Sequence, residues 1–292
     1  MIGRRRCIRT IVGALLSVRF AAAPAQKAQT VPRIGILLYN SPRVEPIAPL
    51  LHRLEAMGYV DGRTLAIEYR FAEGKSEALP ELAAQLVQLK PDLIFAFGGD
   101  VVPFAKKATT SIPIVAWMSN DPVESGTVAS LARPGANVTG ITLVYDELAG
   151  KTLGFLKEAV PAISRVAVLW NPDHADPEFR ETKRAATALG VQLQSLDVRR
   201  PDDFARAFNA AIRERAEGLI IVSSRLMSRQ RQQIAEFAGQ NRIIVAGRWG
   251  EWTKDGALLT YGPDTGELME RVAVYVAKIL KGARPSELPM ER

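Results

Sequence analysis

The chain has very few thiol or imidazole groups with which to do chemistry. Its 292 residues include one cysteine, Cys7, and two histidines, His52 and His174. A single cysteine forms no intramolecular disulfide and supplies no cysteine-rich zinc site. A metal site formed by Asp173, His174 and Asp176 is conceivable. However, three polar residues in one loop are more typical of a solvated turn, so we expect no metal.

Sequence motifs of catalysis and of nucleotide binding are also lacking. No Gly-x-Ser-x-Gly elbow, P-loop or His-Glu-x-x-His occurs, and the glycines at 98 and 99 lack the spacing of a dinucleotide fingerprint. We therefore expect no enzymatic activity, no catalytic residue and no cofactor.

After the N-terminus, no run approaches the ~20 apolar residues of a membrane span.

The first 25 residues resemble an export signal. Arginines at 4, 5, 6 and 9 precede a mostly apolar stretch, and Ala23-Pro24-Ala25 offers a small-x-small cleavage site. The arginine pair at 5 and 6 fits a twin-arginine signal, whereas the later positions and Arg19 leave the general secretory route equally open. The alternative is a disordered basic tail. We expect a periplasmic protein without a lipid anchor, because Cys7 precedes the apolar stretch.

Charge gives no support to nucleic-acid binding. The formal net charge is +7, but the first 25 residues hold five arginines and no acid, so the remainder carries +2. Residues 1–30 are also too short and too apolar for a DNA-binding helix-turn-helix. A ligand-sensing regulator is therefore disfavoured.

Short apolar runs alternate with amphipathic stretches along the rest of the chain, which predicts repeated βα units and parallel sheets. The pattern occurs twice, so we expect two doubly wound α/β lobes. The predicted strands are residues 33–38, 65–69, 93–97, 114–117, 166–169, 192–197, 218–222 and 243–245. The predicted helices are residues 47–57, 79–89, 102–109, 148–159, 179–189, 203–215 (with Asp202 as N-cap), 229–240 and 268–280.

Several phrases, in order along the chain, carry a resemblance to a known family. Three stand together in the middle: SNDPVESG at 119–126, SLARPG at 130–135 and NVTGIT at 137–142. Others are RIGIL at 33–37, LEAMGYVDG at 54–62, IEYR at 67–70, RVAVLWNP at 165–172, YGP at 261–263 and KILKGARP at 278–285. Together they resemble the substrate-binding proteins of bacterial ABC importers of the tryptophan and tyrosine type.

The resemblance implies a type I periplasmic-binding fold, with two lobes joined by a hinge. We expect an N-terminal lobe at 31–140 with a return segment at 263–292, and a C-terminal lobe at 141–262. Residues 138–143 and 258–262 would cross between the lobes, with Gly140 and Gly262 as hinge or plain turn residues. The implied function is capture of a small molecule in the cleft and delivery to an inner-membrane permease with its ATPase, by a monomer.

In open α/β sheets, ligands bind outside the carboxyl ends of the strands. The loops at those ends therefore supply the candidate ligand-binding residues of the first lobe, each weighed against an ordinary turn or helix cap. Asp121 is the acid best placed to pair with a ligand ammonium, or else caps the segment after Pro122. The candidates are Tyr39, Asn40, Ser41, Gly99, Asp100, Ser119, Asn120 and Asp121.

The second lobe is expected to add Asn171, Ser223, Ser224 and Trp249. Two of its loops depart from the family pattern. Arg225 stands where relatives often carry an Asp-Pro pair, and it either favours an acidic ligand or is solvated. The tryptophans at 249 and 252 form an aromatic wall, or at least one packs in the core. An amino acid or a similarly small carboxylate is the expected ligand.

Relatives continue beyond the region of Leu288 and Pro289 with another strand and helices. A missing strand would leave a sheet edge uncovered, and a truncated receptor that no longer binds is one alternative reading. A cytoplasmic ligand sensor and an α/β enzyme of unknown chemistry are the others.

Overall fold

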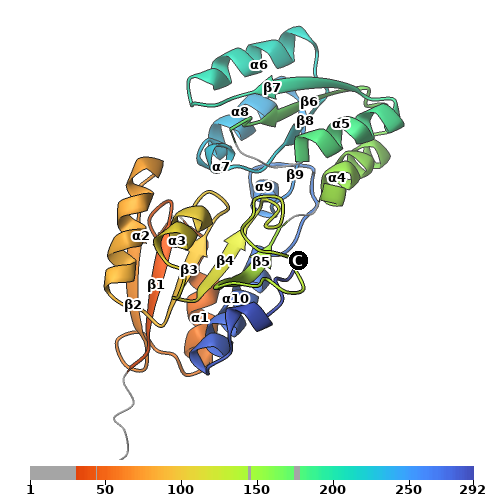
Figure 1. Ribbon diagram of the computed structural model, residues 1–292. Coiled ribbons are helices and arrows are strands. Elements are labelled where there is room, and N and C mark those ends of the chain that lie inside the picture. The colour runs from red at the N-terminus through yellow and green to blue at the C-terminus, as the bar shows by residue number, and fades with distance from the viewer. Residues whose placement is uncertain (1–30, 44, 144–145, 174–177) are drawn as a thin grey trace, which may run out of the picture. The chain divides into compact units, whose positions relative to one another are not determined.

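The computed structural model describes residues 31–43, 45–143, 146–173 and 178–292. The expected export signal and two of the three metal candidates, His174 and Asp176, lie outside the described residues. Residues 31–292 form one compact unit that contains two parallel five-stranded sheets (Figure 1). The expected α/β architecture with two parallel-sheet lobes is confirmed.

The first sheet has the order β2-β1-β3-β4-β5, and all of its pairs are parallel. It begins with a buried apolar run in β1, whose partner β3 is buried at every position. Such continuous burial is typical of parallel sheets covered on both faces. The strands are β1 (Arg33–Leu38), β2 (Ala66–Phe71), β3 (Leu93–Phe97), β4 (Ile114–Met118) and β5 (Val138–Thr142).

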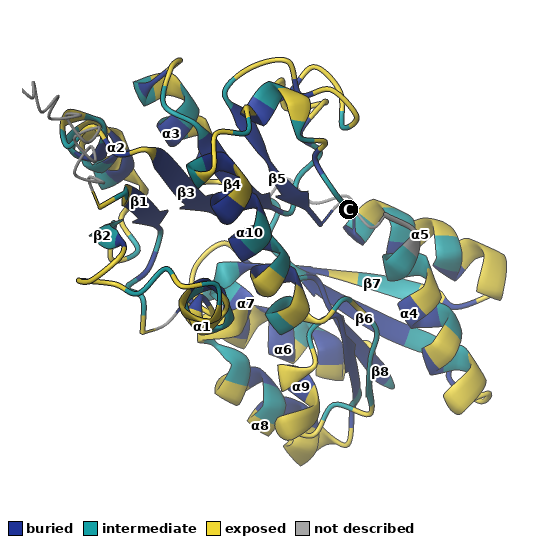
Figure 2. Ribbon diagram, turned by 90° about the horizontal axis from the view of Figure 1, so that it is seen from below, coloured by how far each residue is buried: buried dark blue, intermediate teal, exposed yellow. Residues whose placement is uncertain are grey.

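Helices cover both faces of this sheet. Residues of α1 (Ala48–Ala56) and α10 (Thr265–Leu280) share one apolar cluster with alternate strand residues such as Ile36 and Phe95. The opposite face packs on α2 (Leu79–Gln88) and α3 (Val102–Ala108), with a 3-10 turn at Ser76–Ala78 before α2. Figure 2 shows β3, β4 and β5 in the colour of buried residues, while the outer helix surfaces are exposed.

The second sheet repeats the plan in the order β10-β9-β8-β6-β7, again all parallel. One face packs on α6 and α8, and the other on α4 and α5. The strands are β6 (Arg165–Trp170), β7 (Gln192–Asp197), β8 (Gly218–Ile221), β9 (Ile244–Gly247) and β10 (Leu259–Thr260). The helices are α4 (Asp146–Ala159), α5 (Glu178–Leu189), α6 (Asp203–Arg213), α7 (Arg225–Arg229), α8 (Arg231–Asn241) and α9 (Glu251–Lys254).

The segments expected to cross between the lobes are mostly paired strands. Residues 138–142 form β5, which pairs with β4 along its whole length, and β10 pairs with β9. The chain reaches α4 just after β5 and reaches α10 just after β10. At the start of α10, the Asp264 side chain accepts hydrogen bonds from the backbone N–H groups of Gly266 and Glu267, at 2.7 and 3.1 Å. This cap fixes where the returning helix begins.

The last residues of the chain lie along the outer edge of β5. After a 3-10 turn at Pro285–Glu287, Met290 is buried and Glu291 bridges to Ile141 in parallel. The Thr142 N–H donates to the Glu291 carbonyl at 2.8 Å, and the Glu291 N–H donates to the Gly140 carbonyl at 2.9 Å. The expectation of an uncovered edge is therefore wrong at this point, because the chain itself supplies the partner.

Two expected helix caps are absent. Neither Asp202 nor Asp100 makes a side-chain capping bond to the helix that follows it. Instead, the Asp203 side chain reaches back to the N–H groups of Arg199 and Arg200, and these bonds hold the pKa of Asp203 below its ordinary value. None of the described helices has the length and apolar content to cross a membrane.

The Glu217 carboxylate stabilises the start of the second sheet. It accepts bonds from the N–H groups of Ser164 and Arg165, at 2.7 and 3.0 Å, and these lower the pKa of Glu217. Because a lowered folded-state pKa stabilises the fold above the unfolded pKa, this contribution is lost as pH falls through the folded value. We expect Glu217→Gln to lower the Tm at pH 7 by a few degrees, and the difference to shrink below pH 4.

Thermal unfolding of both proteins between pH 3 and pH 7 measures this effect. Glu158→Gln, at an exposed position on α4, is the matched control. A pH-independent difference between Glu217→Gln and the unchanged protein would contradict the electrostatic explanation.

Candidate functional site

A cavity of about 550 Å³ lies where the carboxyl ends of strands from both sheets face each other. Its volume is within the range of small-molecule sites. Loops after β1, β3 and β4 contribute from the first sheet, and loops after β8 and β9 contribute from the second. The lining residues are Asn40, Glu45, Pro46, Phe97, Gly98, Gly99, Asp100, Trp117, Ser119, Ser223, Ser224, Arg225, Ser228, Arg229, Arg231, Gln232, Trp249, Glu251, Asp255 and Thr265.

Three aromatic rings form one wall of this cavity. Phe97 and Trp117, the neighbouring ends of β3 and β4, stack with ring centroids 4.5 Å apart and planes at 18°. Trp249, from the loop after β9, lies with its centroid 6.4 Å from that of Trp117. A wall of this kind offers a planar ligand an apolar surface. The expectation that at least one of the two tryptophans packs in the core is met by Trp252, which is buried.

Arg225, the first residue of α7, extends from the second lobe into the first. Its Nη1 donates to Glu45 at 2.5 Å, its Nε donates to Asp100 at 3.1 Å, and its Nη2 donates to the Phe97 carbonyl at 3.0 Å. The guanidinium also lies 4.9 Å from the Tyr39 ring centroid, within cation-π range. Arg225 is therefore paired and largely buried, and the alternative of a solvated cation is wrong.

Arg229, one turn further along α7, reaches the same part of the first lobe. Its Nη2 donates to Asn40 Oδ1, and its guanidinium lies 5.7 Å from the Tyr39 ring centroid. Asn40 also donates to Glu45 through its backbone N–H and its Nδ2, both at 3.0 Å. Residues four apart on a helix share a face, so one short helix places two guanidinium groups against Tyr39.

A second arginine cluster borders the cavity. Arg231 pairs with Asp255 at 2.6 Å and lies 4.0 Å from Glu251. Both acids belong to the segment that contains α9, so these pairs join α8 to α9 within the second lobe.

Four buried polar atoms near the cavity have no hydrogen-bond partner among the described residues. They are Trp117 Nε1, Asn120 Oδ1, Ser223 Oγ and Asp255 Oδ2, the last of which makes an ion pair with Arg231. A buried unsatisfied donor or acceptor costs about 1–3 kcal/mol. Retaining such atoms at a cavity is consistent with their use by a polar ligand.

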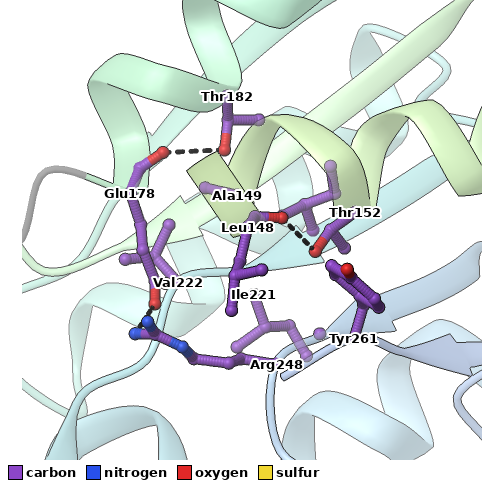
Figure 3. Close-up of a pocket in the computed structure, with 11 residues that line it drawn as sticks. Leu148, Ala149, Thr152, Glu178, Thr182, Ile221, Val222, Arg248 and Tyr261 are labelled. Atoms are coloured by element: carbon purple, nitrogen blue, oxygen red, sulfur yellow. Dashed lines mark hydrogen bonds and ion pairs between the residues drawn. The ribbon is translucent and has the colours of Figure 1, made fainter. Parts of the chain in front are cut away.

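A buried ion pair supports the second-lobe side of the site. Arg248 pairs with Glu178, and both side chains are more than nine-tenths buried (Figure 3). The Glu178 Oε2 accepts from the Ser223 N–H at 3.0 Å, while Arg248 Nη2 donates to the Leu143 carbonyl at 2.9 Å. The pair thus connects the loops after β8 and β9 to the segment that follows β5.

Seven of the residues predicted from the sequence line the cavity: Asn40, Gly99, Asp100, Ser119, Ser223, Ser224 and Trp249. Within this group, Ser224 Oγ also caps α7 by accepting from the Met227 N–H at 3.3 Å.

The other predicted residues are not among those that line the cavity. Tyr39 packs beneath the two arginines and donates from its hydroxyl to the Gly74 carbonyl at 2.7 Å, and Asn120 lies beside Gly99. The Ser41 carbonyl accepts from the Glu45 N–H at 3.1 Å. Asp121 Oδ1 accepts from the N–H groups of Val123 and Glu124, and Asn171 Oδ1 accepts from Asp173 N–H, so each holds its own turn.

Sequence reasoning missed the acid Glu45, the arginines at 229 and 231, and the roles of Glu178 and Arg248. The spacing of Arg225 and Arg229 was the available signal, since charged residues at i and i+4 share a helix face.

The sequence of this chain is similar to sequences of known proteins. Residues 43–292 match the family model described as ABC transporter substrate binding protein. The chain is 26% identical over 240 residues to the tyrosine-binding protein of Clostridioides difficile (strain R20291), covering 81% of this chain and 68% of that protein.

Solved structures of other proteins are also similar to this chain. A conserved domain protein of Vibrio cholerae is 25% identical, with a TM-score of 0.82 and coverage of 90% of this chain and 89% of that one. An ABC domain from Streptococcus pneumoniae, solved in complex with L-Trp, has a TM-score of 0.80 at 19% identity, with the same coverage, and supports the fold alone. The fold is that of the type I periplasmic binding proteins. This chain belongs to the family of ABC transporter substrate-binding proteins.

Proposed function

We propose that this protein is the extracytoplasmic solute-binding component of an ABC importer. It captures a small carboxylate or amino acid in the cavity between its lobes and delivers it to a permease whose ATPase partner uses the ATP. The observation that carries the proposal is the cavity itself, which both lobes line with an aromatic wall and several charged side chains.

Membership of the family supports a binding role over catalysis, because the matched relatives are binding proteins. A cleft between two lobes suits capture, since closure surrounds a ligand and leaves the outer surfaces available to a partner. The basic and then apolar character of residues 1–25 supports export. The same feature supports a periplasmic location.

The decisive experiment is a calorimetric titration of the protein, purified after expression of the full chain, against amino acids and small carboxylates. We expect one ligand class to bind with a Kd in the micromolar range or below, and to raise the Tm because it binds only the folded state. Recovery from the periplasmic fraction of the same cells tests export. A folded protein that binds no member of either class would contradict the proposed ligand class.

A further inference from the structure

We propose that the ligand of this cavity is an aromatic carboxylate that carries no ammonium group, because Arg225 itself occupies the cation position of the site. This inference rests on the proposed function and narrows its substrate class. It follows from the charge pairing among the residues that line the cavity.

The carboxylates of the cavity are already paired. Four acidic residues line it in the described part of the chain: Glu45, Asp100, Glu251 and Asp255. The first two pair with Arg225, and the last two pair with Arg231. Each carboxylate that an ammonium group could meet in the cavity therefore has an arginine within 4.0 Å. Asp121, the acid expected from the sequence to pair with an amine, is absent from the lining and bonds its own turn.

The surroundings of Arg225 are those that an external cation would require. Two carboxylates, one backbone carbonyl and two aromatic rings, Tyr39 and Phe97, surround the guanidinium. The side chain of Glu45 is only 5% exposed, so removal of its cation partner would be costly. A ligand ammonium would have to displace Arg225 from these partners or lie beside its positive charge, and both alternatives oppose binding.

The cavity also holds a cation that has no direct carboxylate partner. Arg229 lines it and has no carboxylate partner among the described residues, since its hydrogen bond goes to the neutral side chain of Asn40. Guanidinium groups bind carboxylates in bidentate geometry. Trp117 Nε1, on a side chain more than nine-tenths buried, is a second donor without a partner in the same cavity.

The aromatic wall completes the ligand's description. The stacked Phe97 and Trp117, with Trp249 beside them, present apolar ring surface in the same cavity as these donors. A planar ring against the wall and a carboxylate at Arg229 use both features together. Neither the aromatic wall nor Arg229 requires an amine on the ligand.

The test compares acids that differ only by the α-amino group: 3-phenylpropionate with L-phenylalanine, and indole-3-propionate with L-tryptophan. Calorimetry on the full-chain protein is expected to show the amine-free acid binding at least about tenfold more tightly in one or both pairs. Arg225→Ala leaves Glu45 and Asp100 unpaired, so it should shift this ratio toward the amino acid by about tenfold or more. Arg229→Ala should weaken binding of the acid.

Arg184→Ala, at an exposed position on α5, is the matched control and should change neither affinity. If an amino acid binds as tightly as its amine-free partner, the inference fails while the receptor function stands. If neither member binds but another amino acid or carboxylate does, the aromatic assignment alone fails; if nothing binds, the proposed ligand class fails too. If Arg225→Ala does not fold, the ratio of the two affinities, for the amine-free acid and for the amino acid, in the unchanged protein still tests the inference.

Discussion

Replacing Gly140 with alanine is expected to lower the free energy of unfolding by about 3–5 kcal/mol, because this strand position admits no side chain. Gly140 has a φ of 136°, which residues with a Cβ rarely adopt. An added Cβ would stand 2.1 Å from the Ala116 carbonyl oxygen and 2.7 Å from the Ala116 nitrogen. Both atoms belong to the backbone of β4, so relief requires β5 to move away from its partner strand.

Chemical denaturation of the two proteins measures the loss. Gly154→Ala is the matched control, because Gly154 lies inside α4 and an added Cβ there meets nothing within 4 Å. That change should stabilise the protein by up to about 1 kcal/mol, the usual gain from glycine to alanine in a helix. Equal and small effects at both positions would show that β5 tolerates a side chain, and would remove the steric argument.

The central strands could be predicted because burial on both faces leaves an uninterrupted apolar run. β1 and β3 have the predicted bounds, and the predicted two-lobed α/β plan holds. The edge strand β5 was predicted to be a crossing between the lobes. Its identity as a strand depends on pairing with β4 and with Glu291, which local sequence does not encode.

The candidate site, like the fold, could be predicted only in part from the sequence. The topology rule for parallel sheets led to loops that border the cavity, and seven predicted residues line it. The pairing of their charges was beyond sequence reasoning, because Arg225 lies 180 positions from Glu45 and 125 from Asp100. The five-residue helix α7 that brings these groups together is too short to show a helical period.

Replacing Arg248 with alanine is expected to lower the free energy of unfolding by about 3–5 kcal/mol, the usual cost of removing one member of a buried ion pair. The change deprives Glu178 of the cation with which it pairs, in a region where both side chains are more than nine-tenths buried. It also removes the donor to the Leu143 carbonyl. Equilibrium unfolding of the variant at pH 7 measures the cost.

A second variant separates charge from packing. If the loss arises mainly from a buried carboxylate deprived of its cation, adding Glu178→Gln to Arg248→Ala should restore part of it, because the amide has no charge to desolvate. Arg184→Ala breaks a pair with Glu181 in which the arginine is exposed, and should cost less than about 1 kcal/mol. A double variant no more stable than Arg248→Ala alone would attribute the loss to packing and to the Leu143 bond instead of to charge.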